Sequence, residues 1–183
     1  SSAASDVYKR QWNIPVTTSI EGKSAFPEDH PLSLGSGGRA NPRPVKHYLA
    51  EADVIFGVGV SFALTAFGVP MPKDKTIIHA TLDPMDLNKD VPAQYGLIGD
   101  AKLSLDALNI AMASFDKSPA TARADEPKKI AALRDAWMSE WLPKLTNNEA
   151  PINPYRVVAE LDRLVDKDNV VITHDAGLSL IHI

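Results

Sequence analysis

The sequence predicts an α/β fold: a parallel sheet with helices on both faces, followed by a linker and the first helix and strand of a second α/β domain. Two observations carry this prediction. Short β-branched, apolar runs alternate with amphipathic helical patterns, as is typical of parallel sheets. A polar, proline-bearing segment then interrupts the alternation, which resumes after it. A chain that is 44% hydrophobic and 23% charged is also typical of a globular protein with a sizeable core.

Four short runs are predicted as strands of the first domain. Each is apolar and rich in β-branched residues, and helical patterns or turn residues bound it. They are residues 14–18 (IPVTT), 54–56 (VIF), 76–80 (TIIHA) and 95–98 (YGLI).

Four helices are predicted from apolar stripes and end signals. Residues 44–52 begin with a proline, and residues 101–115 follow Asp100, a candidate N-cap. Residues 128–142 carry an apolar stripe with two tryptophans and should end at Pro143. The last helix, residues 154–165, follows the N-cap candidate Asn153 and leads into a predicted strand at residues 170–172.

These elements predict the domain boundaries. The central domain covers residues 12–115, and residues 116–127 (DKSPATARADEP) are an interdomain linker. Residues 128–177 form a helical connection and the truncated start of a second domain.

Both ends of the chain are expected to be non-native. Residues 6–11 can be encoded by a DNA string whose reverse complement encodes residues 178–183 (LSLIHI). That string looks like the end of a transposon adapter used to fragment DNA, so residues 1–11 and 178–183 are left out of the fold prediction. The chain is then expected to be a piece of a longer protein.

Composition excludes several classes of function. The net charge of −4 with no basic cluster gives no footprint for nucleic acid or an anionic membrane. The chain contains no cysteine, so disulfides, thiolate metal sites and a cysteine nucleophile are excluded. The uncharged run at residues 54–69 is too short to span a bilayer and contains glycines, which favours a buried strand and a turn. A cytoplasmic protein is expected.

Glycines and one acid at predicted strand ends are candidates for nucleotide binding. Gly57 and Gly59 follow a strand, and Asp83 follows the next one, where an acid could hold a ribose hydroxyl. Gly37 and Gly38 lie in a second glycine-rich loop beside Arg39, which could pair with a phosphate. Plain turn geometry is the better explanation of Gly57 and Gly59 by spacing alone, and it explains the second glycine-rich loop about as well as phosphate binding does.

No metal site is predicted, because the histidines lack metal-ligand spacing. Glu28, Asp29 and His30 share a proline-flanked turn and are expected to be solvated. The loop at residues 174–177 (HDAG) follows the first strand of the second domain, where open α/β sheets bind ligands.

Five ordered stretches together resemble thiamine diphosphate-dependent enzymes of the acetolactate synthase and pyruvate decarboxylase group. Four resemble the central domain: residues 14–35 (IPVTTSIEGKSAFPEDHPLSLG), 51–62 (EADVIFGVGVSF), 76–92 (TIIHATLDPMDLNKDVP) and 97–108 (LIGDAKLSLDAL). Residues 153–177 (NPYRVVAELDRLVDKDNVVITHDAG) resemble the opening of the diphosphate-binding domain. The resemblance implies a Rossmann-like central domain and covers nearly all of residues 12–177.

The resemblance also implies a function. The parent would use thiamine diphosphate and Mg²⁺ to make or cleave a C–C bond next to a carbonyl, most simply on a 2-keto acid, as a homodimer or homotetramer. The activating glutamate and the metal motif would lie outside this chain, so the fragment would be inactive. Ala176 and Gly177 fall where relatives begin their thiamine diphosphate contacts.

The resemblance is weaker for a second cofactor. Relatives bind FAD, or in some cases an adenine nucleotide such as ADP, in the central domain, with an arginine and acids after the strand glycine. This chain has Ser61, Ala63 and Thr65 there, and Thr81 after the next strand, which leaves Asp83. These departures count against FAD, and an empty central domain is an equally good expectation. A non-catalytic nucleotide-binding module and an inert, misassembled polypeptide are the alternatives.

Overall fold

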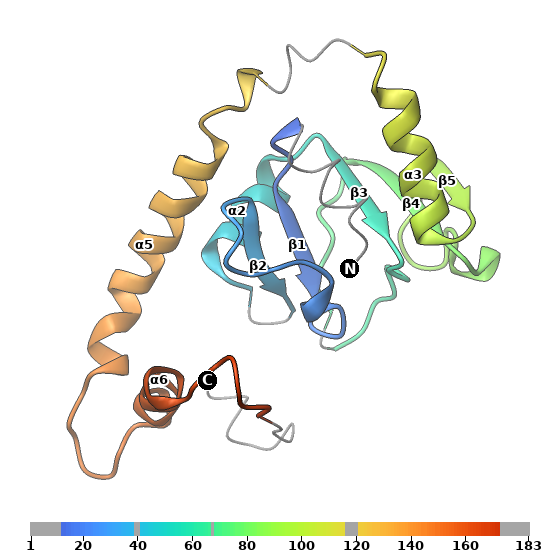
Figure 1. The fold of residues 1–183 in the computed structure, drawn as a ribbon. Helices are drawn as coiled ribbons and strands as arrows, with labels where there is room; N and C mark the ends of the chain where they lie inside the picture. Colours follow the sequence, from blue (N-terminus) through green and yellow to red (C-terminus); the bar gives the residue numbers. More distant parts are fainter. Residues whose placement is uncertain (1–11, 39–40, 67, 116–120, 173–183) are drawn as a thin grey trace. The chain divides into compact units, whose positions relative to one another are not determined.

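The computed structural model describes residues 12–38, 41–66, 68–115 and 121–172 (Figure 1). The chain divides into two compact units, Ser1–Arg134 and Asp135–Ile183. No helix in the described ranges has the length and apolar character needed to cross a bilayer.

The described strands of the first unit form two parallel sheets (Figure 1). Strand β1 (Val16–Ser19) pairs with β2 (Ser33–Gly37), and the 3-10 helix η1 (Lys23–Ala25) lies between them in sequence. Strands β3 (Val54–Val58), β4 (Thr76–Thr81) and β5 (Tyr95–Ile98) form the second sheet in that order. The predicted α/β class with parallel strands is confirmed, and the strands are distributed over two sheets.

Helices connect and cover these strands. Helix α2 (Arg43–Glu51) packs on β2, and α3 (Ala101–Met112) packs on β4. The short 3-10 helix η2 (Pro84–Asp86) follows β4. The predicted N-cap is confirmed, because the Asp100 side chain accepts a hydrogen bond from the Leu103 N–H at 3.0 Å.

Strand β2 is a correction to the sequence prediction, which placed a glycine-rich loop at residues 35–39. Glycines favour turns locally, but this segment pairs with β1 and carries Leu34 into the core. Gly35 has a φ of +91°, and the register of the pair shifts between Val16 and Thr17. Strand pairing therefore overrides the local turn preference, with an irregularity that glycine tolerates.

The core of the first unit includes residues from distant parts of the sequence. Buried Leu32, Leu34, Val45 and Ile130 form one cluster, against which the half-buried side chains of Tyr48 and Leu49 pack. The first three of these residues lie on or beside β2 and α2. Ile130 comes from helix α5 (Glu126–Leu145), which begins within the last two residues of the predicted linker.

Strand β5 is exposed along its whole length. It pairs only with β4 in the described part of the chain. Its large side chains keep much of their surface in contact with solvent: Tyr95 is 63% exposed, Leu97 40% and Ile98 52%.

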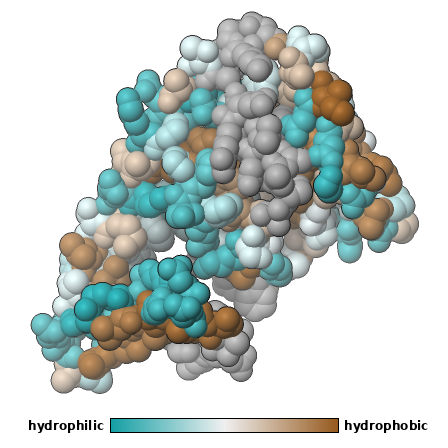
Figure 2. Space-filling model, in the orientation of Figure 1, coloured by the Kyte–Doolittle hydropathy of each residue, from teal (hydrophilic) through white to brown (hydrophobic). Residues whose placement is uncertain are grey.

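The second unit contains the end of α5 and helix α6 (Pro154–Leu164). Asn153 caps α6 as predicted, since its side chain accepts a hydrogen bond from the Tyr155 N–H at 3.0 Å. Apolar side chains gather along α6 beside polar ones (Figure 2), and several are exposed: Val157, Val158, Leu161 and Leu164. Trp137, Trp141 and Tyr155 form an aromatic cluster. The Lys144 ammonium lies over the Trp141 ring, 4.4 Å from its centroid.

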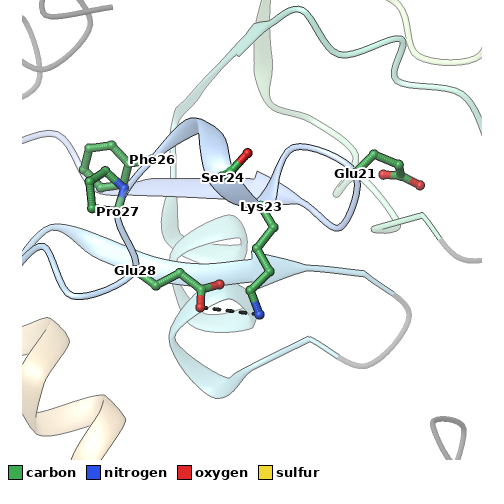
Figure 3. A pocket seen from close by; sticks show the side chains of 6 residues that line it. All are labelled: Glu21, Lys23, Ser24, Phe26, Pro27 and Glu28. Atoms are coloured by element: carbon green, nitrogen blue, oxygen red, sulfur yellow. Dashed lines mark ion pairs between the residues drawn. The ribbon is translucent and has the colours of Figure 1, made fainter. Parts of the chain in front are cut away.

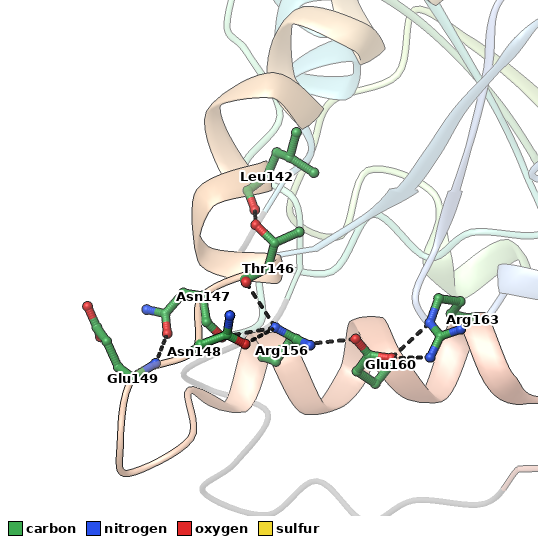
Figure 4. A network of polar contacts seen from close by, with 8 residues as sticks. All are labelled: Leu142, Thr146, Asn147, Asn148, Glu149, Arg156, Glu160 and Arg163. Carbon is green, nitrogen blue, oxygen red and sulfur yellow. Dashed lines mark hydrogen bonds and ion pairs between the residues drawn. The ribbon is translucent and has the colours of Figure 1, made fainter.

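Arg156 ties the turn after α5 to α6 (Figure 4). Its guanidinium donates to the backbone carbonyls of Thr146 at 2.9 Å and Asn147 at 3.1 Å. It also donates to the Asn148 side chain at 2.9 Å and pairs with Glu160 at 2.8 Å. One guanidinium therefore donates to four acceptors and stabilises this helical hairpin.

Two predictions about this region are wrong. Helix α5 does not end before Pro143 but continues to Leu145. The proline removes one hydrogen bond from the last turn, and the Thr146 N–H and hydroxyl then both donate to the Leu142 carbonyl, at 3.1 and 2.8 Å. Residues 170–172 form no strand: they are exposed, and no described strand lies beside them to supply hydrogen bonds.

Candidate functional site

The first candidate site is the carboxyl edge of the sheet β3–β4–β5, where open α/β sheets bind ligands. Gly57 lies in β3, directly opposite His79 of β4. Gly59 follows β3, and Asp83 follows β4. The fold therefore brings the three predicted residues of this site to one edge of one sheet.

Gly57 is required there by close packing of the chain on itself. A Cβ placed on Gly57 would overlap the ring of Phe62, with its Cε2 atom at 2.5 Å, and would lie 2.7 Å from Val60 Cγ1. The Phe62 ring also meets the His79 ring edge to face, with centroids 4.9 Å apart. The loop after β3 thus folds back over the strand that precedes it.

His79 holds this loop by a hydrogen bond from β4. Its side chain is fully buried, and Nε2 lies 2.6 Å from the Val60 carbonyl oxygen. A carbonyl only accepts, so Nε2 carries a proton and donates it to this bond. Nδ1 has no hydrogen-bond partner among the described residues. The sequence marked His79 only as a strand residue, and nothing local to it indicated this contact.

Gly59 and Asp83 also have roles within the chain. Gly59 has a φ of +63°, and its N–H donates to the Ala80 carbonyl at 2.8 Å, which extends the contact between β3 and β4. Beyond its chain neighbours, no atom of the described residues lies within 4 Å of a Cβ placed on it, so it adjoins open space among them. The Asp83 carboxylate accepts from the Met85 N–H at 2.8 Å and so begins η2. Nucleotide binding by these residues stays a prediction.

The loops after β3 and β4 are held together. The Leu64 N–H donates to the Asp90 carboxylate at 2.9 Å. Together with the His79–Val60 hydrogen bond, this bond connects the loop after β3 at two points to β4 and to the loop that follows it. The carboxyl edge is therefore a preformed surface.

The second candidate site is the carboxyl edge of the sheet β1–β2. Gly37 ends β2 and is buried, and a Cβ placed on it would lie 2.7 Å from Val69 Cγ2. The Gly38 N–H donates to the Asn41 side chain at 2.8 Å. These glycines therefore serve close packing and a turn, and their proposed contact with a nucleotide is untested. Arg39 lies outside the described residues.

A chain of polar contacts runs across this edge. The Thr18 and Ser36 hydroxyls lie 3.1 Å apart, and Ser36 donates to Glu28 at 2.7 Å. Glu28 pairs with Lys23 at 3.5 Å (Figure 3). The Glu28 side chain is 43% exposed, as expected for a solvated turn residue, and its carboxylate also meets two partners.

A shallow depression of about 550 Å³ adjoins these side chains (Figure 3). Its walls are Glu21, Lys23, Ser24, Phe26, Pro27 and Glu28. The spacing of Glu28 and Ser36 gave no signal for this site, because their contact depends on the missed strand β2.

The predicted thiamine diphosphate contacts, Ala176 and Gly177, lie outside the described residues. Within the described ranges, no group of three acidic, histidine or cysteine side chains is arranged to hold a metal ion.

Comparison with known proteins identifies the family. Residues 7–108 match the family model described as "Thiamine pyrophosphate enzyme, central domain". A probable acetolactate synthase large subunit from Methanocaldococcus jannaschii is 33% identical over 175 residues, which cover 90% of this chain and 28% of the relative. Acetolactate synthase isozyme 3 large subunit from Escherichia coli K12 is 29% identical over 167 residues, covering 90% of this chain and 28% of the relative.

A third relative is named for a different activity. A probable 2-ketoarginine decarboxylase from Pseudomonas aeruginosa is 29% identical over 157 residues, covering 84% of this chain and 27% of the relative. The chain thus spans less than a third of the length of each of these three relatives.

Proposed function

The chain belongs to the thiamine pyrophosphate enzyme family, and from this premise we propose that it is part of an enzyme acting at a bond next to a carbonyl. That enzyme uses thiamine diphosphate and Mg²⁺ to make or cleave a C–C bond, most simply on a 2-keto acid. The match of residues 7–108 to the family's central domain carries this proposal. The relatives described above, acetolactate synthases and a probable 2-ketoarginine decarboxylase, support the substrate class.

In this proposal the described residues supply a scaffold. Thiamine diphosphate, when bound, supplies the electron sink that such a reaction needs. The activating carboxylate and the metal ligands would come from parts of the enzyme outside this chain, with Ala176 and Gly177 on the thiamine diphosphate side. The chain alone would then be inactive. We further propose a cytoplasmic homodimer or homotetramer.

The test is made on the chain and on its parent. The 183-residue chain, titrated calorimetrically with thiamine diphosphate and Mg²⁺, is expected to give no binding heat. Tight, Mg²⁺-dependent binding would contradict the proposed division of labour. The parent reading frame, recovered by sequencing the source DNA outward from both ends, should consume a 2-keto acid only with both cofactors present. Activity that survives removal of both would sink the proposal.

Nucleotide binding is the second candidate function. Gly59 favours it, because a residue with positive φ beside open space at a carboxyl edge lets a phosphate approach the backbone. Gly57 and Asp83 weigh against it, since each is already engaged within the chain. FAD is therefore left out of the main proposal. Titrating the chain with ADP and with FAD tests this candidate, and saturable binding that Gly59→Val abolishes would support it.

A further inference from the structure

The first nine residues of helix α5 belong to the first unit, although the sequence predicted that this helix follows an interdomain linker. Three side chains spaced four residues apart lie on one face of a helix. In residues 126–134, which we call the strap, these are Glu126, Ile130 and Arg134. Each of the three meets a different part of the first unit.

The central contact is apolar. Ile130 is 1% exposed and completes the cluster with Leu32, Leu34 and Val45. Without the strap, this part of β2 and α2 would lose the side chain that covers it. An uncovered cluster of large apolar residues is costly in water.

The two flanking contacts are polar and specific. The Tyr48 hydroxyl of α2 donates to the Glu126 carboxylate at 2.6 Å. The Arg134 guanidinium donates to the Ser33 carbonyl, at the start of β2, at 2.7 Å. These partners are 78 and 101 residues apart in sequence, so the contacts are tertiary.

The electrostatics of Glu126 agree with a docked strap. Burial alone would raise the pKa of its carboxyl, but hydrogen bonds from Lys129 and Tyr48, with the charges of Lys129 and Arg123, lower it below its ordinary value. The carboxylate therefore stays charged and holds the Tyr48 hydroxyl. Burial, followed by this hydrogen bond and the Glu126 charge, raises the pKa of Tyr48.

We propose that the strap is an obligatory part of the first unit, which folds and unfolds together with it. The folding unit then extends through Arg134, past the predicted linker at residues 116–127 and past the residues that match the family model. This proposal does not depend on the proposed function.

Native-state hydrogen exchange of the full chain tests the proposal. The amides of residues 130–134 and those of β2 are expected to exchange at the same slow rate, because one opening event exposes both. If the strap amides exchange about tenfold faster or more, the strap opens on its own and the proposal falls.

Two variants sharpen the test. Ile130→Ala should speed exchange of the strap and β2 together, by about 30-fold or more. If this variant does not fold, Ile130→Val removes a single methyl group and should speed both by about two- to tenfold. Met138→Ala on the same helix, whose side chain is 42% exposed, is the matched control and should leave β2 unchanged. A rise confined to residues 130–134 would overturn the proposal.

Discussion

Replacing Gly57 with alanine is expected to destabilise the first unit by overpacking one identified contact. The new Cβ would lie 2.5 Å from Phe62 Cε2 and 2.7 Å from Val60 Cγ1, so the loop that carries both must move. That loop is fastened by the bonds from His79 and to Asp90, which resist the movement. Overpacking of this kind costs about 1–3 kcal/mol.

A double-mutant cycle identifies the cause. Phe62→Ala should itself cost about 3–5 kcal/mol, because the ring is buried against His79. In that background the alanine at position 57 no longer meets the ring, so its cost should fall by about 1 kcal/mol or more, and what is left reports the overlap with Val60. Gly59→Ala is the matched control: it has room but a left-handed backbone, so it should cost about 1–2 kcal/mol through strain alone.

Urea unfolding followed by tryptophan fluorescence measures these costs. The chain has three tryptophans, and Trp137→Phe with Trp141→Phe leaves buried Trp12 as the reporter of the first unit. If Gly57→Ala costs as much with Phe62 absent as with it present, the overlap with the ring is not what requires glycine.

Three further predictions test other contacts. His79→Phe keeps an aromatic ring but leaves the Val60 carbonyl without its donor, so the first unit should lose about 1–3 kcal/mol in the same urea assay; an unchanged midpoint would contradict the bond. Arg156→Met should lower the melting temperature of the second unit, followed by near-UV circular dichroism of its tryptophans, because four acceptors lose their donor. Since the folded pKa of Glu126 is depressed, its contribution is present above the unfolded value of about 4.3 and is lost as pH falls through the folded value. In a plot of unfolding free energy against pH, Glu126→Gln should therefore weaken the loss of stability on the acid side. Tyr48→Phe should weaken the loss on the alkaline side, because the folded pKa of Tyr48 is raised. If the variants and the wild type give the same pH dependence, the Glu126–Tyr48 pair does not stabilise the fold.

Local signals found much of the fold. Strands β3, β4 and β5 are apolar, β-branched runs, and the caps Asp100 and Asn153 bond the backbone as their residue types predict. Strand β2 was missed because its glycines favour a turn, and only pairing with β1 makes it a strand. Contacts that depend on the pairing of β1 with β2, such as the hydrogen bond from Ser36 to Glu28, therefore could not be predicted from residue spacing.

The candidate site shows the same division. The sequence placed Gly57, Gly59 and Asp83 at strand ends, and the fold brings them to one edge. In the fold, Gly57 lies against Phe62 and opposite His79, and Asp83 accepts from the Met85 N–H. No periodic sequence pattern predicts those contacts. The role of Ile130 was equally hidden, because a polar segment separates it in sequence from the core that it completes.

The exposed strand β5 has a practical consequence for work on this chain. Within the described residues β5 pairs with β4 alone, so its outer edge offers backbone groups to any other strand, including the β5 of another molecule. Concentrated solutions are therefore expected to associate edge to edge, and light scattering should rise with protein concentration. A lysine at Leu97 would blunt that edge by placing a charge where a second sheet would have to approach.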